Sequence, residues 1–323
     1  MVANNNLILS VKSVDDVVRC LTLSSLLEVS GFPKPGNVHR THDFMDTRFE
    51  HFLSGIVAIQ PDFLHFCEKI ITHEFNKDSN FDFIELGLFF KAATESMMKW
   101  QSGGNILLGH ILLLPPLAGA TIISLKINKL KFENFRFFLE KIIRDSTVED
   151  TINLYKAIRT SNPGGLGTID KYDLNDENSI SQIIEDGITL KEIFNLSQEY
   201  DMISRQYATN FKVIFEEGLP YFLKTFKEVG DINSTIVNTY LKILSLYPDT
   251  LIIRKSGYDA ADKVQKFASE IITEGGITTE TGKKMIYKFD KYLQQSEGKL
   301  NPGTTADLVA GVIFCALIFG VRF

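Results

Sequence analysis

Cysteine is scarce in this sequence, and its three occurrences stand far apart. Cys20, Cys67 and Cys315 form no C-x-x-C pair. This spacing excludes a disulfide framework and a zinc site built from thiolates, since both need several cysteines in close or repeated spacing. We therefore expect three buried thiols in a reducing compartment.

An excess of positive charge is also missing. The chain carries 34 Lys and Arg residues against 40 Asp and Glu residues, which gives a formal net charge of −6. Phosphate backbones bind surfaces of the opposite sign, so nucleic acid is not an expected partner. The first residues show no basic segment followed by an apolar stretch, so the sequence predicts a cytoplasmic protein.

Two apolar runs resemble membrane spans but lack the necessary length or continuity. The run 106–125 is interrupted by His110 and by the pair Pro115-Pro116, and the run 308–321 has only 14 residues. A helix needs about 20 apolar residues to cross a bilayer. Both runs are expected to be central core helices, and no membrane partner is expected.

Several familiar catalytic motifs are absent as well. The sequence has no G-x-x-x-x-G-K-[ST] phosphate loop, no H-E-x-x-H and no G-x-S-x-G, and no G-x-G-x-x-G follows a strand pattern. These absences leave the reaction open to other signals.

The sequence is rich in helical periodicity. Its 44% hydrophobic and 23% charged residues are typical of a folded globular protein. Period-two alternation is nearly absent, whereas capping signals followed by apolar spacings of three and four recur throughout. The pattern predicts an all-α fold, with a single multi-helix globular domain over 13–323 after a flexible N-terminus at 1–12. A polar stretch without periodicity predicts a long surface loop near 161–187, suited to act as a lid.

Capping boxes mark several helix starts. The box Ser13-x-x-Asp16 opens a helix that ends at Gly31 and carries Glu28 on its last turn. Further boxes are expected to begin at Thr47, Ser146 and Thr189. The remaining predicted helices cover 189–217, 233–247, 258–274, 280–296 and 305–321.

The densest chemical signal is the loop that follows the first helix. Pro33 and Pro35 stiffen it, and its polar residues are Lys34, Gly36, Asn37, His39, Arg40, His42, Asp43 and Asp46. Cations, histidines and carboxylates in one rigid segment suit a polyanion and a proton-transfer group held together. The alternative is a proline-rich helix connection with incidental surface charge.

Three later segments carry weaker signals. Gly104 and Asn105 lead into an apolar helix whose free N–H groups attract anions, although a simple turn explains them equally. Asp249 could bind Mg²⁺ while Arg254 or Lys255 neutralises phosphate, and a solvated loop is the alternative.

The last segment, 301–308, turns into the final helix. It contains Gly303 in the turn, and it places Asp307 in the first turn of the helix. Helix capping explains Asp307 without any function.

Taken in order, the four segments resemble the triphosphoribosyl-dephospho-CoA synthase family. The resemblance spans about 13–321 and rests on Glu28 with 33–36, on 42–46, on 102–109, on 249–257 and on 301–309. The chain departs from the family pattern at two places. Ile106-Leu107-Leu108 replaces Thr-His-Lys, and residues 301–305 match the pattern Ser-Pro-Gly-Gly only in part. These departures indicate a divergent branch.

The resemblance implies a transferase that joins C1′ of the ATP ribose to a ribose hydroxyl of dephospho-CoA or a related acceptor and releases adenine. It implies ATP as a substrate and Mg²⁺ as a cofactor. A homo-oligomer and a downstream carrier protein that receives the product remain open. The roles it implies are as follows. Catalysis falls to Asp43, His42 and Asp249; nucleotide and phosphate binding to Lys34, Gly36, Asn37, His39, Arg40, Gly104, Asn105, Arg254, Lys255 and Gly303; metal binding to Glu28, Asp46 and Asp249.

Two other functions stay open at this point. His39, His42, Asp43 and a distant Asp249 are similar to the ligand set of HD-type metal-dependent phosphohydrolases, although here most of them lie on one loop. Alternatively, the aliphatic residues at 106–108 indicate a non-catalytic helical nucleotide-binding protein.

Overall fold

The computed structural model describes residues 6–165 and 167–323, and over these residues the regular structure is helical, with only two isolated β-bridges. The predicted all-α class is therefore confirmed. The α-helices are α1 (Val14–Ser30), α2 (Phe49–Thr72), α3 (Leu86–Trp100), α4 (Leu108–Lys126), α5 (Phe132–Arg144), α6 (Val148–Ser161), α7 (Ser179–Asp186), α8 (Leu190–Ser197), α9 (Met202–Ala208), α10 (Leu219–Val229), α11 (Ile232–Leu246), α12 (Thr250–Ser256), α13 (Tyr258–Thr273), α14 (Glu280–Gln294) and α15 (Gly303–Ile318).

Helix α1 begins where the capping box predicts. The Ser13 side chain accepts a hydrogen bond from the Asp16 backbone N–H at 3.2 Å, which satisfies one of the free donors of the first turn. The helix ends before Gly31, so Glu28 lies on its last turn as predicted.

Other predicted boundaries are shifted or wrong. The box expected at Ser146 is formed one residue later, by Thr147 with Asp150, and α2 begins at Phe49. The single helix predicted over 189–217 is broken into α8, α9 and a π-helix, Val213–Gly218. It breaks because Asp201 caps a new helix instead of continuing the old one.

Two predicted irregular segments are shorter than expected. Helix α7 lies inside the loop predicted over 161–187, so only about its first two thirds is irregular. At the N-terminus, Leu9 and Val11 are buried, and the backbone N–H of Leu9 bonds to Leu130 O at 2.9 Å. The packed chain thus starts earlier than the predicted flexible segment 1–12 allows, whereas residues 1–5 lie outside the described residues.

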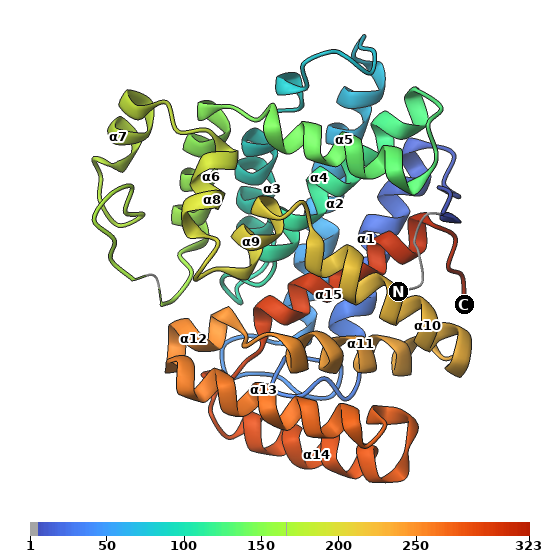
Figure 1. The fold of residues 1–323 in the computed structure, drawn as a ribbon. Coiled ribbons are helices and arrows are strands. Elements are labelled where there is room, and N and C mark those ends of the chain that lie inside the picture. The colour runs from blue at the N-terminus through green and yellow to red at the C-terminus, as the bar shows by residue number, and fades with distance from the viewer. Residues whose placement is uncertain (1–5, 166) are drawn as a thin grey trace.

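Helices α4 and α15 form the centre of the molecule. Every residue of α4 from Gly109 to Ser124 is buried, and α15 is buried almost completely. In length and composition α4 could cross a membrane, but 89% of its apolar window is buried inside the structure. Helix α15 packs against α1, α4, α10 and α11 and lies near the middle of the molecule in Figure 1. These two apolar runs are core helices, as predicted.

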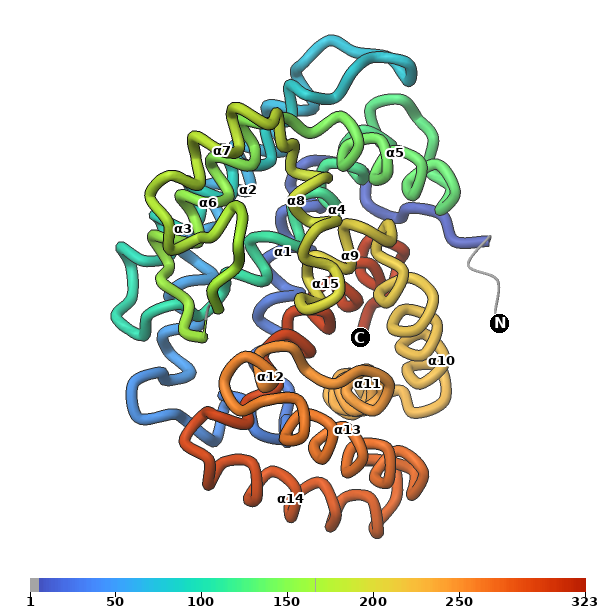
Figure 2. The backbone as a smooth tube through the Cα atoms, turned by 60° about the vertical axis from the view of Figure 1, so that its left-hand side comes forward, coloured from blue at the N-terminus to red at the C-terminus, as the bar shows by residue number. Residues whose placement is uncertain are grey.

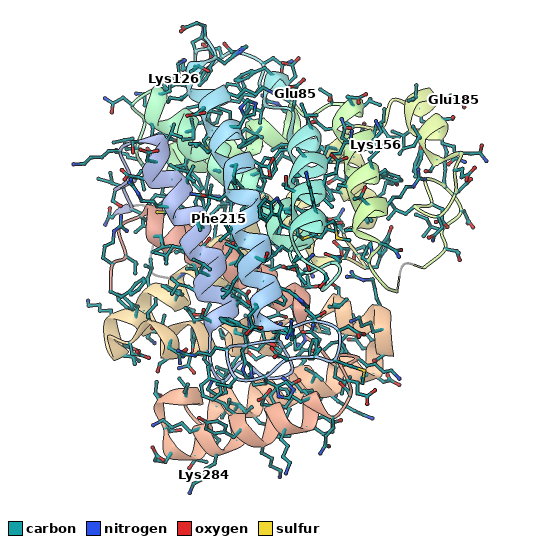
Figure 3. All side chains as sticks on the ribbon, turned by 180° about the vertical axis from the view of Figure 1, so that it is seen from behind. Glu85, Lys126, Lys156, Glu185, Phe215 and Lys284 are labelled. Carbon is teal, nitrogen blue, oxygen red and sulfur yellow. The ribbon has the colours of Figure 1, made fainter. Side chains whose placement is uncertain are left out.

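Helices α11 to α14 form a group on one side of this centre. Both views place α14 at its outer edge, and α13 lies between α14 and α11 (Figures 1 and 2). The chain between α1 and α2 crosses the boundary between this group and the rest of the molecule (Figure 3). This position brings the predicted loop into contact with helices from the far end of the sequence.

Candidate active site

The loop after α1 is held rigidly by the C-terminal helices. Tyr240 of α11 donates a hydrogen bond from its hydroxyl to Pro35 O at 2.8 Å, and the Gly36 N–H donates to Asp290 of α14 at 3.0 Å. Gly36 has a φ of 76°, and a Cβ there would overlap Leu293, so only glycine fits. The Pro33–Gly36 segment is therefore held in one conformation by its contacts with α11 and α14.

Lys34 is fully buried within this segment. Its ammonium donates to Glu28 O at 2.9 Å and also to the Glu28 carboxylate. Burial raises the pKa of Glu28, whereas the neighbouring Lys34 charge lowers it. In this structure Lys34 therefore neutralises Glu28 and has no exposed surface to offer to a phosphate.

His110 and Asp307 extend this pair. The His110 Nε2 atom lies 3.6 Å from Glu28 Oε2 and 3.6 Å from Asp307 Oδ1, and its Nδ1 lies 3.1 Å from Ser25 Oγ. We call Glu28, Lys34, His110 and Asp307 the buried cluster. Its four members come from α1, the loop, α4 and α15, so it joins segments from both ends of the chain.

Burial sets the protonation of this cluster. It lowers the pKa of His110 to about 3, with the Lys34 charge acting in the same direction, so the imidazole is neutral near pH 7. Burial also raises the pKa of Asp307 well above its usual range, and the charges of Glu28 and Asp249 add to this effect. A carboxyl group with a raised pKa and a neutral imidazole thus lie side by side.

Gly109 makes room for Asp307. A Cβ atom at position 109 would overlap the Asp307 carboxylate, so any side chain there would push α15 or the carboxylate away. The glycine that precedes His110 is thus a requirement of the cluster.

Asp249 joins two helices beside the cluster. Its Oδ1 accepts from the backbone N–H groups of Leu251 and Ile252, at 2.9 and 3.2 Å. Its Oδ2 accepts from the N–H and hydroxyl of Thr305, at 2.7 and 2.8 Å. Because both oxygens are engaged, Asp249 serves here as a cap for α12 and a tie to α15.

Arg254 supplies the cation on this side. Its Nη1 lies 2.9 Å from Asp201 Oδ2, its Nε has no hydrogen-bond partner among the described residues, and its side chain is 27% exposed. Lys255 donates to Gly298 O at 3.2 Å. Gly303 packs closely against Leu251, since a Cβ there would lie 2.6 Å from Leu251 Cδ2.

The other predicted residues lie outside the buried cluster. Asp43 accepts from the Phe49 N–H at 2.8 Å and so caps α2, while Asp46 and Arg40 are exposed. His42 exchanges backbone hydrogen bonds with His39.

The remaining predicted phosphate binders also have structural contacts. The side chain of His39 lies 3.5 Å from Asp290. The backbone carbonyl of Asn37 accepts from Gln294 at 3.0 Å. Asn105 caps the start of α4 by accepting from Leu108 N–H at 3.3 Å, and Gly104, with a φ of 75°, faces open space.

The structure thus brings together Glu28, Lys34, Asp249 and Arg254 from the predicted set. The residues that the sequence analysis did not select are His110 and Asp307. The available signal for His110 is a single histidine inside an apolar helix, which argues against a membrane span but does not by itself indicate a site. Asp307 was explained as a helix cap, whereas the structure places it in the second turn of α15, against His110.

The residues predicted to hold a metal do not form a ligand set. Among the described residues, no group of three or more His, Cys, Asp or Glu side chains could hold a metal ion. Glu28 is paired with Lys34, and both oxygens of Asp249 are engaged. The HD-type interpretation has the same difficulty, because His42 and Asp43 lie on the loop, outside the cluster. We therefore derive no step through a metal held by the protein alone.

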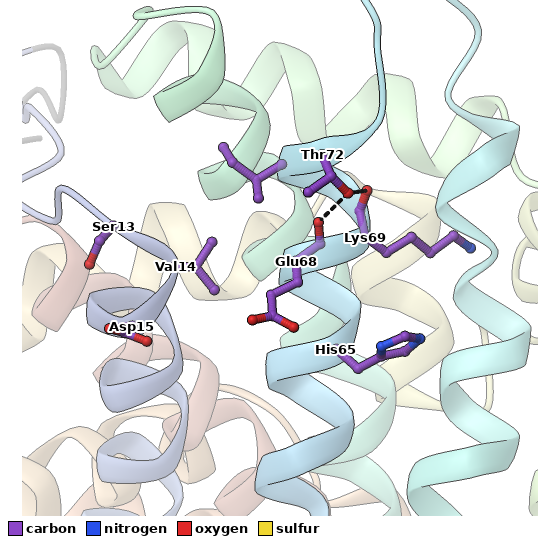
Figure 4. Close-up of a pocket in the computed structure, with 8 residues that line it drawn as sticks. Ser13, Val14, Asp15, His65, Glu68, Lys69 and Thr72 are labelled. Atoms are coloured by element: carbon purple, nitrogen blue, oxygen red, sulfur yellow. Dashed lines mark hydrogen bonds between the residues drawn. The ribbon is translucent and has the colours of Figure 1, made fainter.

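Two hollows lie in very different surroundings. One is a narrow gap beside Asp249 and Thr305, between α9, α11, α12 and α15, with no room for a water-sized molecule. A larger groove of about 680 Å³ lies between the start of α1 and the end of α2, lined by Ser13, Glu68 and Lys69 (Figure 4). That groove is at the opposite end of α1 from Glu28.

Comparisons with known proteins match this chain to one family. The chain matches the family profile described as CitG, ATP:dephospho-CoA triphosphoribosyl transferase, over residues 14–322. It is 28% identical over 102 residues to the 2-(5''-triphosphoribosyl)-3'-dephosphocoenzyme-A synthase of Klebsiella pneumoniae, covering 32% of this chain and 33% of that protein. The matched segment thus spans about a third of the relative.

A solved structure supports the relationship over a longer stretch. A protein of Archaeoglobus fulgidus, provisionally assigned as a triphosphoribosyl-dephospho-CoA synthase, superposes with a TM-score of 0.62 at 26% identity. The match covers 84% of this chain and 100% of the other. Sequence and fold therefore point to the same relatives.

Proposed function

Because this chain belongs to the CitG family of ATP:dephospho-CoA triphosphoribosyl transferases, we propose that it transfers the triphosphoribosyl group of ATP to a ribose hydroxyl of dephospho-CoA or a closely related acceptor. Adenine is the second product. The protein acts on these small molecules in the cytoplasm.

The observation that carries the proposal is the buried cluster. Glu28 and Lys34 from the first stretch of the family resemblance meet Asp307 from the last, and His110, which directly follows the stretch 102–109, lies between them. Glycosyl transfer needs a proton donor for the departing base and a site that excludes water, because water would compete with the acceptor hydroxyl. The Asp307 carboxyl beside a neutral histidine meets the first need, and the near-complete burial of Lys34, Glu28 and His110 limits water on that side.

We assign the triphosphate to the Arg254 side of the cluster. The guanidinium is partly exposed and keeps one nitrogen without a partner. Arginine binds phosphate oxygens through two parallel N–H groups, and Lys255 follows it in sequence. Asp201, which now contacts Arg254, would give way to the phosphate.

Magnesium would enter with the nucleotide under this proposal. Mg²⁺ commonly reaches nucleotide sites through phosphate oxygens, waters and one or two carboxylates rather than through an all-protein cage. This agrees with the absence of a ligand set among the described residues. The ion would neutralise charge on the triphosphate.

The proposal is tested by following adenine. The purified protein is incubated with Mg²⁺ and ATP, with and without dephospho-CoA, and adenine and product mass are measured. We expect one adenine released for each triphosphoribosylated acceptor. ATP hydrolysed to ADP or AMP without adenine would favour a phosphohydrolase instead. ATP bound without turnover, with dephospho-CoA and related acceptors all tried, would favour the non-catalytic alternative.

A further inference from the structure

We infer that Asp307 is the catalytic acid that protonates the departing adenine, an inference that rests on the proposed triphosphoribosyl transfer. It assigns a chemical role to a residue that sequence patterns explain as a helix cap.

Solvent access singles out Asp307 within the buried cluster. The side chains of Lys34, Glu28 and His110 are 0%, 3% and 2% exposed, whereas that of Asp307 is 20% exposed. The cluster thus runs from a sealed end at Lys34 to an open end at Asp307. A substrate that approaches this cluster can touch Asp307 before any other member.

The contacts of Asp307 point to a built site. Its Oδ1 lies 3.6 Å from His110 Nε2, and the adjacent Gly109 has no side chain, which leaves the space that the carboxylate fills. A group used only for helix capping would not need such a cleared space on a neighbouring helix. Two adjacent residues of α4, Gly109 and His110, therefore position this carboxyl group.

The surroundings keep the proton on Asp307. Burial raises its pKa most, Glu28 of α1 and Asp249 before α12 raise it further, and Lys34 and Arg254 lower it. His110 on α4 is neutral and adds no compensating charge. A carboxyl group whose pKa is raised in this way is more often protonated than an ordinary aspartate, and a catalytic acid must carry the proton that it donates.

The step balances without any other reactant. The bond between C1′ and the adenine nitrogen breaks, and its electron pair goes to adenine, which takes the proton of Asp307. The acceptor hydroxyl oxygen forms the new bond to C1′ and loses its proton to solvent. Asp307 then regains one proton from solvent, so the products are neutral adenine and the triphosphoribosylated acceptor.

The test uses a substrate that does not need an acid. Asp307→Asn keeps the shape of the side chain but has no acidic proton. It is compared with the wild type on ATP and on N7-methylated ATP, whose cationic purine leaves without protonation. Product mass with dephospho-CoA is measured, so spontaneous loss of the purine is not counted. Asp145→Asn, another partly buried carboxylate, 12% exposed, that accepts a bond from Phe81 N–H, is the matched control.

We expect Asp307→Asn to slow product formation from ATP by about 100-fold or more, the usual effect of losing a catalytic acid. Product formation from N7-methylated ATP should stay within a few-fold of the wild type. Asp145→Asn should leave both rates unchanged. In the wild type, kcat/KM for ATP should fall at high pH as Asp307 loses its proton, while the rate with N7-methylated ATP should not.

Three results would contradict the inference. Unchanged ATP turnover by Asp307→Asn would remove Asp307 from the chemistry and leave the proposed function intact. Equal loss with both substrates in a folded variant would show a binding or structural role. A wild type that releases no adenine would overturn the proposed function together with the inference. Should Asp307→Asn not fold, the two wild-type pH profiles decide, because identical profiles exclude an acid that acts only on adenine.

Discussion

At the residue scale, the main feature of this molecule is the buried cluster of four ionisable side chains. A buried charge is costly unless it is paired or neutralised. Lys34 and Glu28 neutralise each other, His110 avoids the cost by being uncharged near pH 7, and the raised pKa of Asp307 favours its uncharged form. Perturbed pKa values of this kind gather at functional sites, which is why the cluster outweighs the more conspicuous exposed residues of the loop.

The folded state should resist acid poorly because of His110. Its pKa is about 3 in the folded protein against an ordinary 6.5, so the unfolded chain binds more protons between these values. The contribution of His110 to the free energy of unfolding should therefore fall as pH drops below 6.5, by as much as ~5 kcal/mol by pH 3. Guanidinium unfolding at several pH values between 7 and 4 measures this dependence.

The comparison that isolates His110 is the variant His110→Asn. It should show a shallower loss of stability with falling pH than the wild type, whatever its stability at pH 7. His65→Asn, at an exposed position on α2, should keep the wild-type slope. Parallel slopes for wild type and His110→Asn would show that this histidine is not buried in its neutral form. The raised pKa values of Glu28 and Asp307 act oppositely, since they favour folding at low pH.

The family pattern is altered near this histidine. Where the family has histidine, this chain has the fully buried Leu107, and His110 follows three residues later, on the first turn of α4. The imidazole at position 110 lies in the core, beside Glu28 and Asp307.

Helix caps are the decisive feature at the scale of elements. Asp201 and Asp249 each begin a short helix, and the same two helices position Arg254 and its partner. The sequence predicts longer helices and simple loops there, because a single aspartate can act as a cap or as an exposed helical residue. Contacts from other helices decide which.

Asp249→Ala should destabilise the protein by about 2 to 4 kcal/mol. The change leaves Thr305 and two N–H groups of α12 without their acceptor inside the fold, and buried groups that lose their partners are costly. Asp231→Ala, which removes the exposed cap of α11, should cost only about 1 kcal/mol. Chemical denaturation measures both. Equal costs would show that Asp249 is an ordinary cap.

At the scale of the whole molecule, α15 connects the site to the rest of the fold. It returns through the centre from the C-terminal group and passes α12, α4 and α1. The gap beside Asp249 has no room for a water-sized molecule, whereas typical small-molecule sites have volumes of roughly 300 to 1,000 Å³. ATP therefore needs this region to open.

Hydrogen–deuterium exchange should locate that opening. With Mg²⁺ and ATP added, we expect slower exchange in α12 and at the start of α15, while α5, on another side of the molecule, should be unchanged. Arg254→Gln should lose most of the protection, because the guanidinium is the proposed phosphate ligand. Protection at the groove between Ser13 and Glu68 instead would place the nucleotide at the opposite end of α1.

By itself the sequence determined the helical class, the core role of α4 and α15, the burial of the three thiols and the presence of a stiff loop with Lys34 after the first helix. These follow from periodicity, length and local stiffness, which act between near neighbours in the chain. Only the tertiary structure decided that Glu28, His110 and Asp307 meet, that Lys34 is sealed, and that Asp43 and Asp249 cap helices. Burial and proximity depend on how distant helices pack, and they alone set the charge of each buried group.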